Sequence, residues 1–84
     1  MRYDVELKLR ARKDLRRIAK PDAAQILAAL NELEKDLHGD IKRLTNFTPE
    51  YRLRIGDYRA LFEIEQPNRV VVYRVRHRRD VYRN

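Results

Sequence analysis

The sequence predicts an α+β fold in the order β-α-α-β-β-β, with one antiparallel sheet and an N-terminal helical hairpin packed on one of its faces. Two observations predict it. Apolar residues recur at helical spacing through the first half of the chain, and they alternate with polar residues near the N-terminus and in the last third. The 84 residues allow a single domain, residues 1–84. Because the chain has no cysteine, a hydrophobic core must stabilise this small domain without disulfides.

The first half is expected to hold one strand and two helices. Residues 3–7 alternate between apolar and charged side chains, as in a half-buried strand. From Lys8 to Ala19 the apolar residues fall on one helical stripe, and basic residues occupy the other face. Pro21 is expected to break this helix. Asp22 is placed to cap the start of a second helix, and Gly39 is placed to end it.

The last third is expected to form a three-stranded antiparallel meander. Residues 39–50 are predicted to be a loop, because they are rich in Gly, Asp, Asn, Thr and Pro. Strands are predicted over 51–55, 58–65 and 69–76. The pair Gly56-Asp57 between the first two strands favours a tight turn.

Alternation along these strands predicts a strongly basic sheet face. Val71, Tyr73 and Val75 are expected to face the helices, because side chains on a strand alternate between the two faces. The opposite face then collects arginines from all three strands: Arg52, Arg54, Arg59, Arg74 and Arg76. Charged residues on an open sheet face also serve solubility. Solvated faces, however, usually mix both signs of charge, and here Glu63 is nearly alone among the arginines.

The charge balance of the whole chain also favours a polyanionic partner. The formal net charge is +7 and the sequence pI is about 10.1. Nucleic acid is the commonest partner of such a surface, ahead of an acidic protein or an anionic membrane. The N-terminus lacks the apolar run of a signal peptide, and no apolar stretch approaches the roughly 20 residues of a membrane span. We therefore expect a cytoplasmic protein that does not enter the membrane.

Two motifs resemble a known family. They are YRLRIGDYR at residues 51–59 and VRHRRDVY at residues 75–82. Together, and in this order of elements, they resemble the RelE branch of the RelE/ParE superfamily of toxins from type II toxin–antitoxin systems. The resemblance covers nearly the whole chain.

The resemblance implies a ribosome-dependent mRNA endonuclease. Toxins of this branch insert a basic sheet face into the ribosomal A site and cut the mRNA codon there, which inhibits translation. The ribose 2′-OH attacks the neighbouring phosphate without a metal ion or another cofactor, and leaves a 2′,3′-cyclic phosphate and a 5′-OH. This chemistry needs a proton acceptor, cations at the developing phosphorane and a proton donor for the leaving oxygen.

The resemblance also assigns roles to residues of this chain. Arg59 and Arg76 look like the phosphate-stabilising catalytic arginines, and Tyr82 looks like the tyrosine that stacks on or orients the base. Arg52 and Arg54 stand where relatives carry lysines. Because arginine stays protonated, these two can neutralise phosphate but cannot accept the proton. The candidate acid–base residues are His77, Glu63 and Tyr82. The expected phosphate contacts are Arg52, Arg54, Arg74, Arg78 and Arg79.

Two other functions stay open, and a partner is expected. A ParE-like toxin would share the fold but inhibit DNA gyrase, and a plain nucleic-acid-binding module would explain the charge without catalysis. A toxin of this superfamily implies an acidic, RelB-like antitoxin that neutralises it, and the pair could assemble as a heterotetramer. Codon preference does not follow from the sequence.

Overall fold

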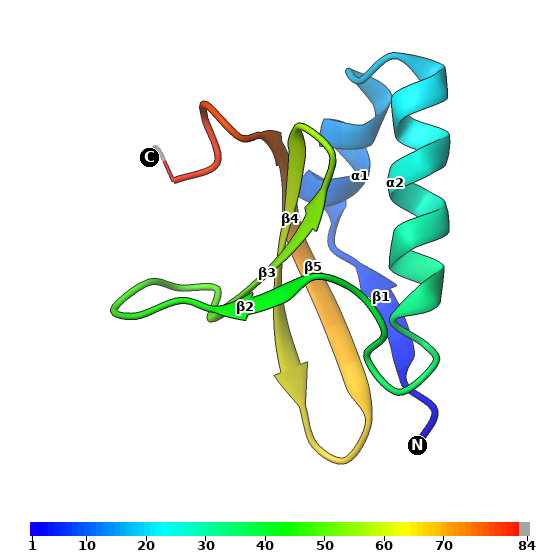
Figure 1. Ribbon diagram of the computed structural model, residues 1–84, viewed down its shortest axis with the longest axis vertical. Helices are drawn as coiled ribbons and strands as arrows, with labels where there is room; N and C mark the ends of the chain where they lie inside the picture. The colour runs from blue at the N-terminus through cyan, green and yellow to red at the C-terminus, as the bar shows by residue number, and fades with distance from the viewer. Residues whose placement is uncertain (83–84) are drawn as a thin grey trace.

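The computed structural model describes residues 1–82, so Arg83, which belongs to the basic C-terminal run of the sequence, lies outside it. The elements follow one another as β1 (Asp4–Leu7), α1 (Leu9–Arg16), α2 (Lys20–Glu32), β2 (Ile41–Arg43), β3 (Tyr51–Ile55), β4 (Tyr58–Glu65) and β5 (Arg69–His77). In Figure 1 the two helices lie on one side of the sheet, whereas the β2–β3 loop and the C-terminal tail project from the other side. The α+β prediction is confirmed.

The sheet is mixed rather than antiparallel, which corrects the prediction. Its order is β1-β5-β4-β3-β2, and β1 pairs in parallel with β5, from Asp4 opposite Arg69 to Leu7 opposite Val72. The other neighbouring strands are antiparallel. A parallel pair needs a long crossover connection, and here the helical hairpin and the three intervening strands supply it. The local sequence pattern of neither strand indicates this long-range pairing.

A fifth strand, β2, lies where a loop was predicted. Residues 41–43 pair with β3, with Lys42 opposite Arg52. The strand has only three residues and sits at the edge of the sheet, where its side chains are largely exposed. A strand this short has too few residues for alternation to distinguish it from a loop.

Both helices differ in their bounds from the prediction. Helix α1 ends at Arg16, and α2 begins at Lys20, so that Pro21 lies in the first turn of α2. Proline is tolerated there because the first N–H groups of a helix have no intrahelical acceptor. Pro21 therefore starts the second helix instead of merely ending the first, and Asp22 lies within the first turn rather than at the cap. No helix within residues 1–82 is long and apolar enough to cross a membrane.

The core lies between the helices and the sheet. Ala11 of α1, Ile26 and Leu30 of α2, and Phe62 and Val72 of the sheet are almost completely buried and belong to one cluster. The helices therefore cover one face of the sheet and leave the other face uncovered. We call the face that the helices do not cover the open face.

A bulge in β5 changes the predicted alternation. Leu61 pairs with Arg74 and Phe62 with Val72, so Tyr73 has no partner on β4. The extra residue moves the side chains that precede it on β5 to the opposite face of the sheet from the predicted one. Val71, which was predicted to face the helices, therefore lies beside Glu63 on the open face, and Val72 joins the core instead.

Candidate nucleic-acid interface

Three arginines lie in one row across the open face. Arg54 of β3 is opposite Arg59 of β4, and Arg59 is opposite Arg76 of β5. Directly opposite residues on one sheet face have Cβ atoms about 4.5–5.5 Å apart. We call Arg54, Arg59 and Arg76 the arginine row. The structure thus brings together on one surface both predicted catalytic arginines and one of the predicted phosphate contacts.

The turn between β3 and β4 holds Arg59 in place. Its guanidinium NH1 donates to the carbonyl oxygens of Gly56 at 2.8 Å and Tyr58 at 2.9 Å. Gly56 makes the turn with φ of +57°, in the left-handed region that glycine adopts without strain. Arg59 is half-buried, and this burial lowers its pKa from the usual value, with the charges of Arg54 and Arg52 lowering it further. Cations held together at this density favour an anion among them.

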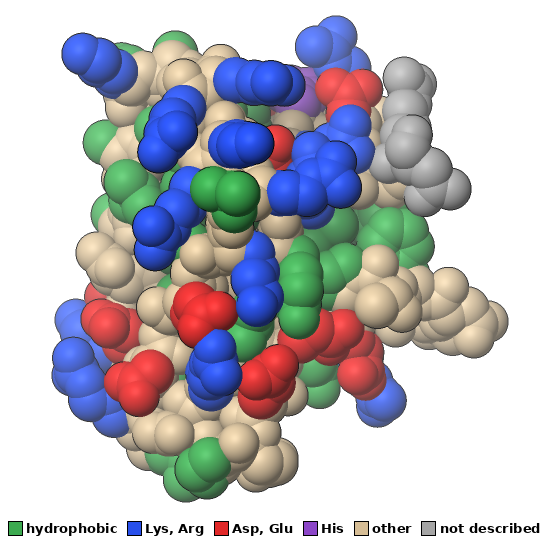
Figure 2. Space-filling view, turned by 180° about the vertical axis from the view of Figure 1, so that it is seen from behind, with side chains coloured by type: hydrophobic (Ala, Val, Ile, Leu, Met, Phe, Trp, Pro, Cys, Tyr) green, Lys and Arg blue, Asp and Glu red, His purple; other side chains and the backbone are tan. Residues whose placement is uncertain are grey.

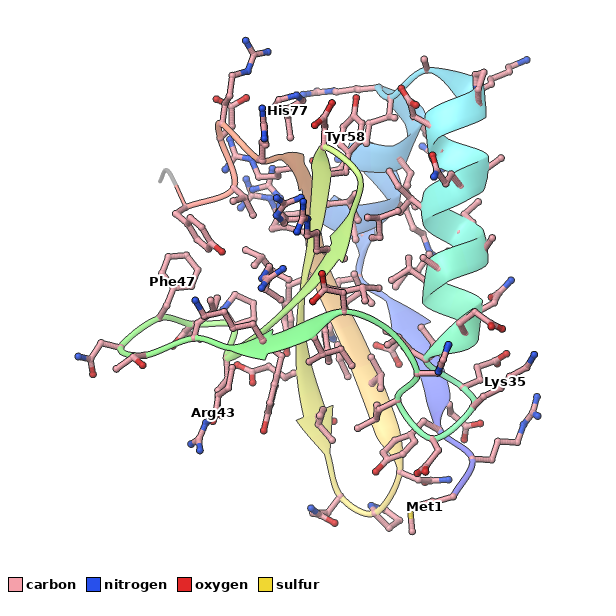
Figure 3. All side chains as sticks on the ribbon, in the orientation of Figure 1. Met1, Lys35, Arg43, Phe47, Tyr58 and His77 are labelled. Atoms are coloured by element: carbon pink, nitrogen blue, oxygen red, sulfur yellow. The ribbon has the colours of Figure 1, made fainter. Side chains whose placement is uncertain are left out.

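The C-terminal tail, residues 78–82, folds back toward this row. The backbone N–H of Arg78 donates to the carbonyl of Asp57 at 2.8 Å, and its Nε lies 3.8 Å from the Asp57 carboxylate. Asp57 belongs to the turn that also holds Arg59, so the tail begins beside the row, and the charge of Arg78 lowers the pKa of Arg59 as well. The ring of Tyr82, 49% exposed, meets Phe47 of the β2–β3 loop edge-to-face, with centroids 5.3 Å apart. Figure 3 shows Phe47 pointing from its loop toward the tail.

A groove of about 620 Å³ runs between the β2–β3 loop and the open face. Leu61 and Val81, both buried, line it together with Phe47, while Arg76 and Glu63 supply charge. Tyr73, predicted to face the helices, also lines this groove because of the bulge. The groove is thus apolar along one part and cationic beside it.

Arg74 lies on the predicted face but is engaged by α1. Its Nε and NH2 donate to the two oxygens of Asp14 at 2.8 and 3.1 Å, and this hydrogen bonding raises the pKa of Arg74. The backbone N–H of Val75 donates to the same carboxylate at 2.9 Å. Because β1 ends opposite Val72, α1 follows beside the rest of β5, and Asp14 satisfies an edge N–H that β1 does not reach. Arg74 therefore fixes α1 to the sheet.

The remaining predicted residues divide between the two faces. Glu63 is half-buried on the open face, and no ion pair joins it to another residue within 1–82. His77 lies opposite Tyr58, in the row next to Arg76, and packs edge-to-face on that ring. Its Nδ1 accepts hydrogen bonds from the backbone N–H and the Nε of Arg79. Glu63 therefore shares the open face with the arginine row, farther along β4, whereas His77 lies on the opposite face.

Positive charge is concentrated at one end of the molecule. Figure 2 shows Lys and Arg side chains covering the end near the tail, whereas acidic and basic side chains mix at the other end. At that mixed end Arg69 pairs with Glu6 and Glu65. The end that carries the arginine row has fewer acidic neighbours to neutralise it, and this is the arrangement expected for a surface that receives an anion.

The sequence as a whole places the chain in a known family. A sequence model described as the ParE toxin of the type II toxin–antitoxin system parDE matches residues 5–82. The chain belongs to this toxin family. No sequence match was found among curated proteins.

Solved structures of toxin–antitoxin complexes resemble the toxin closely. The RelBE2 complex of Mycobacterium tuberculosis contains a chain with a TM-score of 0.79 and 27% identity, covering 92% of this chain and 99% of that one. A chain of the RelB–RelE complex of Methanococcus jannaschii has a TM-score of 0.74 and 25% identity, covering 92% and 94%. The archaeal RelE–RelB complex of Pyrococcus horikoshii OT3 shares the fold, with a TM-score of 0.77 at 22% identity over 96% and 100%. The toxin is thus of the RelE type in its architecture.

Two residues of the toxin's open side escaped the sequence-based reasoning. Lys42, an exposed residue of β2, lies opposite Arg52 of β3. Its segment was predicted to be a loop without a defined face. Phe47 lies in the same segment and meets Tyr82 only because the chain folds back there. A lone aromatic residue in a polar, turn-rich segment was the one available signal for it.

Proposed function

We propose that this toxin is a metal-independent endoribonuclease that cleaves mRNA codons in the ribosomal A site and so inhibits translation. The observation that carries the proposal is the arginine row, with the tail that carries Tyr82 anchored to the adjacent β3–β4 turn. Three guanidinium groups on one rigid surface suit the dianionic phosphorane of phosphoryl transfer, because preorganised cations stabilise charge as it develops. The RelE-type architecture supports the same reading.

The proposed reaction needs no group beyond the RNA and the side chains. The 2′-oxygen forms a bond to phosphorus and gives its proton to a general base. The bond from phosphorus to the 5′-oxygen breaks, and that oxygen takes a proton from a general acid. Arg59 and Arg76 stabilise the phosphorane in between, and Tyr82 orients the base next to the scissile phosphate.

The general base is one of Glu63, Tyr82 and His77. Glu63 lines the groove on the same face as Arg76, which favours it on position. His77 already uses its Nδ1 to accept two hydrogen bonds, and its ring packs on Tyr58. We therefore expect Glu63→Gln to lower cleavage more than His77→Gln.

The decisive experiment adds purified toxin to translating ribosomes and maps the mRNA ends. Removing one charge-stabilising donor typically lowers kcat about 10²–10³-fold, so we expect Arg76→Ala to fall in that range. Tyr82→Phe is expected to fall as well. Arg69→Ala is the matched control, since it removes the same charge from the other end of β5. Intact mRNA with wild-type toxin, or equal losses in Arg76→Ala and Arg69→Ala, would contradict the proposal.

A second function is supported by the family match itself. The matching family is described as ParE, and a ParE-like toxin would inhibit DNA gyrase. A gyrase supercoiling assay in parallel with the cleavage assay separates the two. Gyrase inhibition that survives Arg59→Ala, with no mRNA cleavage, would establish the alternative.

We further propose an acidic antitoxin partner and a cytoplasmic site of action. The similar solved structures are toxin–antitoxin complexes. The net charge of +7 favours an acidic segment that covers the arginine row or displaces Tyr82, in a complex such as a heterotetramer. Cleavage that continues unchanged in the presence of excess bound partner would contradict this account of neutralisation.

A further inference from the structure

Phe47 stands out as an aromatic residue that the core does not use. It lies in the β2–β3 loop, and it is not part of the cluster of buried and packed apolar side chains. Binding residues are disproportionately carried by loops that a rigid scaffold positions, so this ring is a candidate for contact with a ligand. Its contacts are with Tyr82 and with the groove on the open face.

The loop that carries Phe47 has a defined shape. The backbone N–H of Leu44 donates to the carbonyl of Glu50 at 2.7 Å and closes the loop at its base. Arg43 and Glu50 add an ion pair at the same place. Asn46 turns the chain just before Phe47 with φ of +55°, a conformation that asparagine tolerates better than most residues. The ring is therefore held toward the tail rather than free in solvent.

The surroundings of Phe47 match a nucleobase in chemistry. Leu61 and Val81 give the groove an apolar floor, and Phe47 forms its wall. Arg76 lines the same groove and belongs to the arginine row. A flat heterocycle stacks well on an aromatic ring, and its attached phosphate needs a cation nearby.

We propose that Phe47 binds a nucleobase of the RNA substrate in this groove and holds the ring of Tyr82 in position beside it. The proposal rests on RNA as the substrate of the proposed function, but it assigns a binding residue that the two sequence motifs do not contain. The base lies against Phe47, Leu61 and Val81, and the neighbouring phosphate lies on the arginine row. Phe47 thus adds affinity for a base at this position without selecting its identity, because every base has a face that can stack.

The test measures binding to two uncleavable probes by fluorescence anisotropy. One is a 2′-O-methyl RNA hexanucleotide, and the other is the same backbone without bases. Stacking of one base typically changes affinity by about 5- to 150-fold, so wild-type toxin should prefer the first probe at least about fivefold. Phe47→Leu should lose most of this preference while binding the abasic probe unchanged. Phe47→Tyr should retain it, and Thr45→Ala in the same loop serves as the control.

Three results would overturn the inference. Wild-type toxin that does not distinguish the two probes has no base site, and full preference in Phe47→Leu means that Phe47 does not form it. Equal weakening of both probes by Phe47→Leu, with a lowered melting temperature, assigns Phe47 to loop structure instead. Failure of the nuclease proposal is separately visible, because it leaves the binding preference intact while translating ribosomes keep their mRNA whole.

Discussion

Asp14 offers the sharpest test of how this fold is held together, because one carboxylate joins α1 to the edge of β5. It accepts two hydrogen bonds from Arg74 and one from the backbone N–H of Val75. The side chains of Asp14 and Arg74 are 13% and 24% exposed, so solvent screens this pair only in part. Asp14→Ala leaves a partly buried guanidinium and an edge N–H without this acceptor.

The expected cost follows from these contacts. Hydrogen bonds to charged groups contribute about 1.5–3 kcal/mol, and breaking a buried pair from one side costs about 3–5 kcal/mol. The partial exposure puts Asp14→Ala at the lower end, and the higher helix propensity of alanine offsets roughly 0.5 kcal/mol. We expect a net loss of about 2.5 kcal/mol in the free energy of unfolding. In a domain of this size that corresponds to a fall of about 10–20 °C in Tm.

The assay is urea unfolding followed by far-ultraviolet circular dichroism at pH 7. Asp14→Asn keeps the shape and one acceptor oxygen, so it should lose about half as much as Asp14→Ala. Glu32→Ala removes an exposed carboxylate that pairs with Lys35, and it should change stability by less than about 0.5 kcal/mol. If Asp14→Ala costs no more than Glu32→Ala at an unchanged m-value, the reasoning about the β5 edge is refuted.

Three further outcomes follow from other parts of the structure. Lys42→Gln should reduce the slope of log affinity against log salt concentration for single-stranded RNA by about 0.7. Arg43→Gln should leave this slope unchanged, because the Arg43 side chain points away from the groove in Figure 3. Equal slopes for the two variants would remove Lys42 from the interface. The hydrogen bond from Arg69 lowers the pKa of Glu6, so Glu6→Gln should destabilise the toxin at pH 7. The difference in stability between the variant and wild type should vanish as the pH falls below the folded pKa of Glu6. Urea midpoints that differ as much at pH 2 as at pH 7 would contradict this. Gly56→Ala should cost about 1–2 kcal/mol because φ is positive there, and calorimetry showing no loss would mean that the turn relaxes freely.

Pattern alone was sufficient for the strands that carry the arginine row. The bounds of β3 and β4 match the prediction, because alternation over 51–55 and 58–65 and the Gly56-Asp57 turn are local properties. The same alternation put Arg54, Arg59 and Arg76 on one face, and the register across the three strands confirms it.

The sequence by itself determined the fold class, the basic face of the sheet and the family, because these depend on periodicity, charge and short motifs that neighbouring residues carry. Only the tertiary structure decided the parallel pairing of β1 with β5, the bulge at Tyr73 and the capture of Arg74 by Asp14. It also decided that Phe47 meets Tyr82, which lies far along the chain. Each of these features joins residues distant in sequence, and their free energy depends on packing and on satisfying buried polar groups, which no local pattern records.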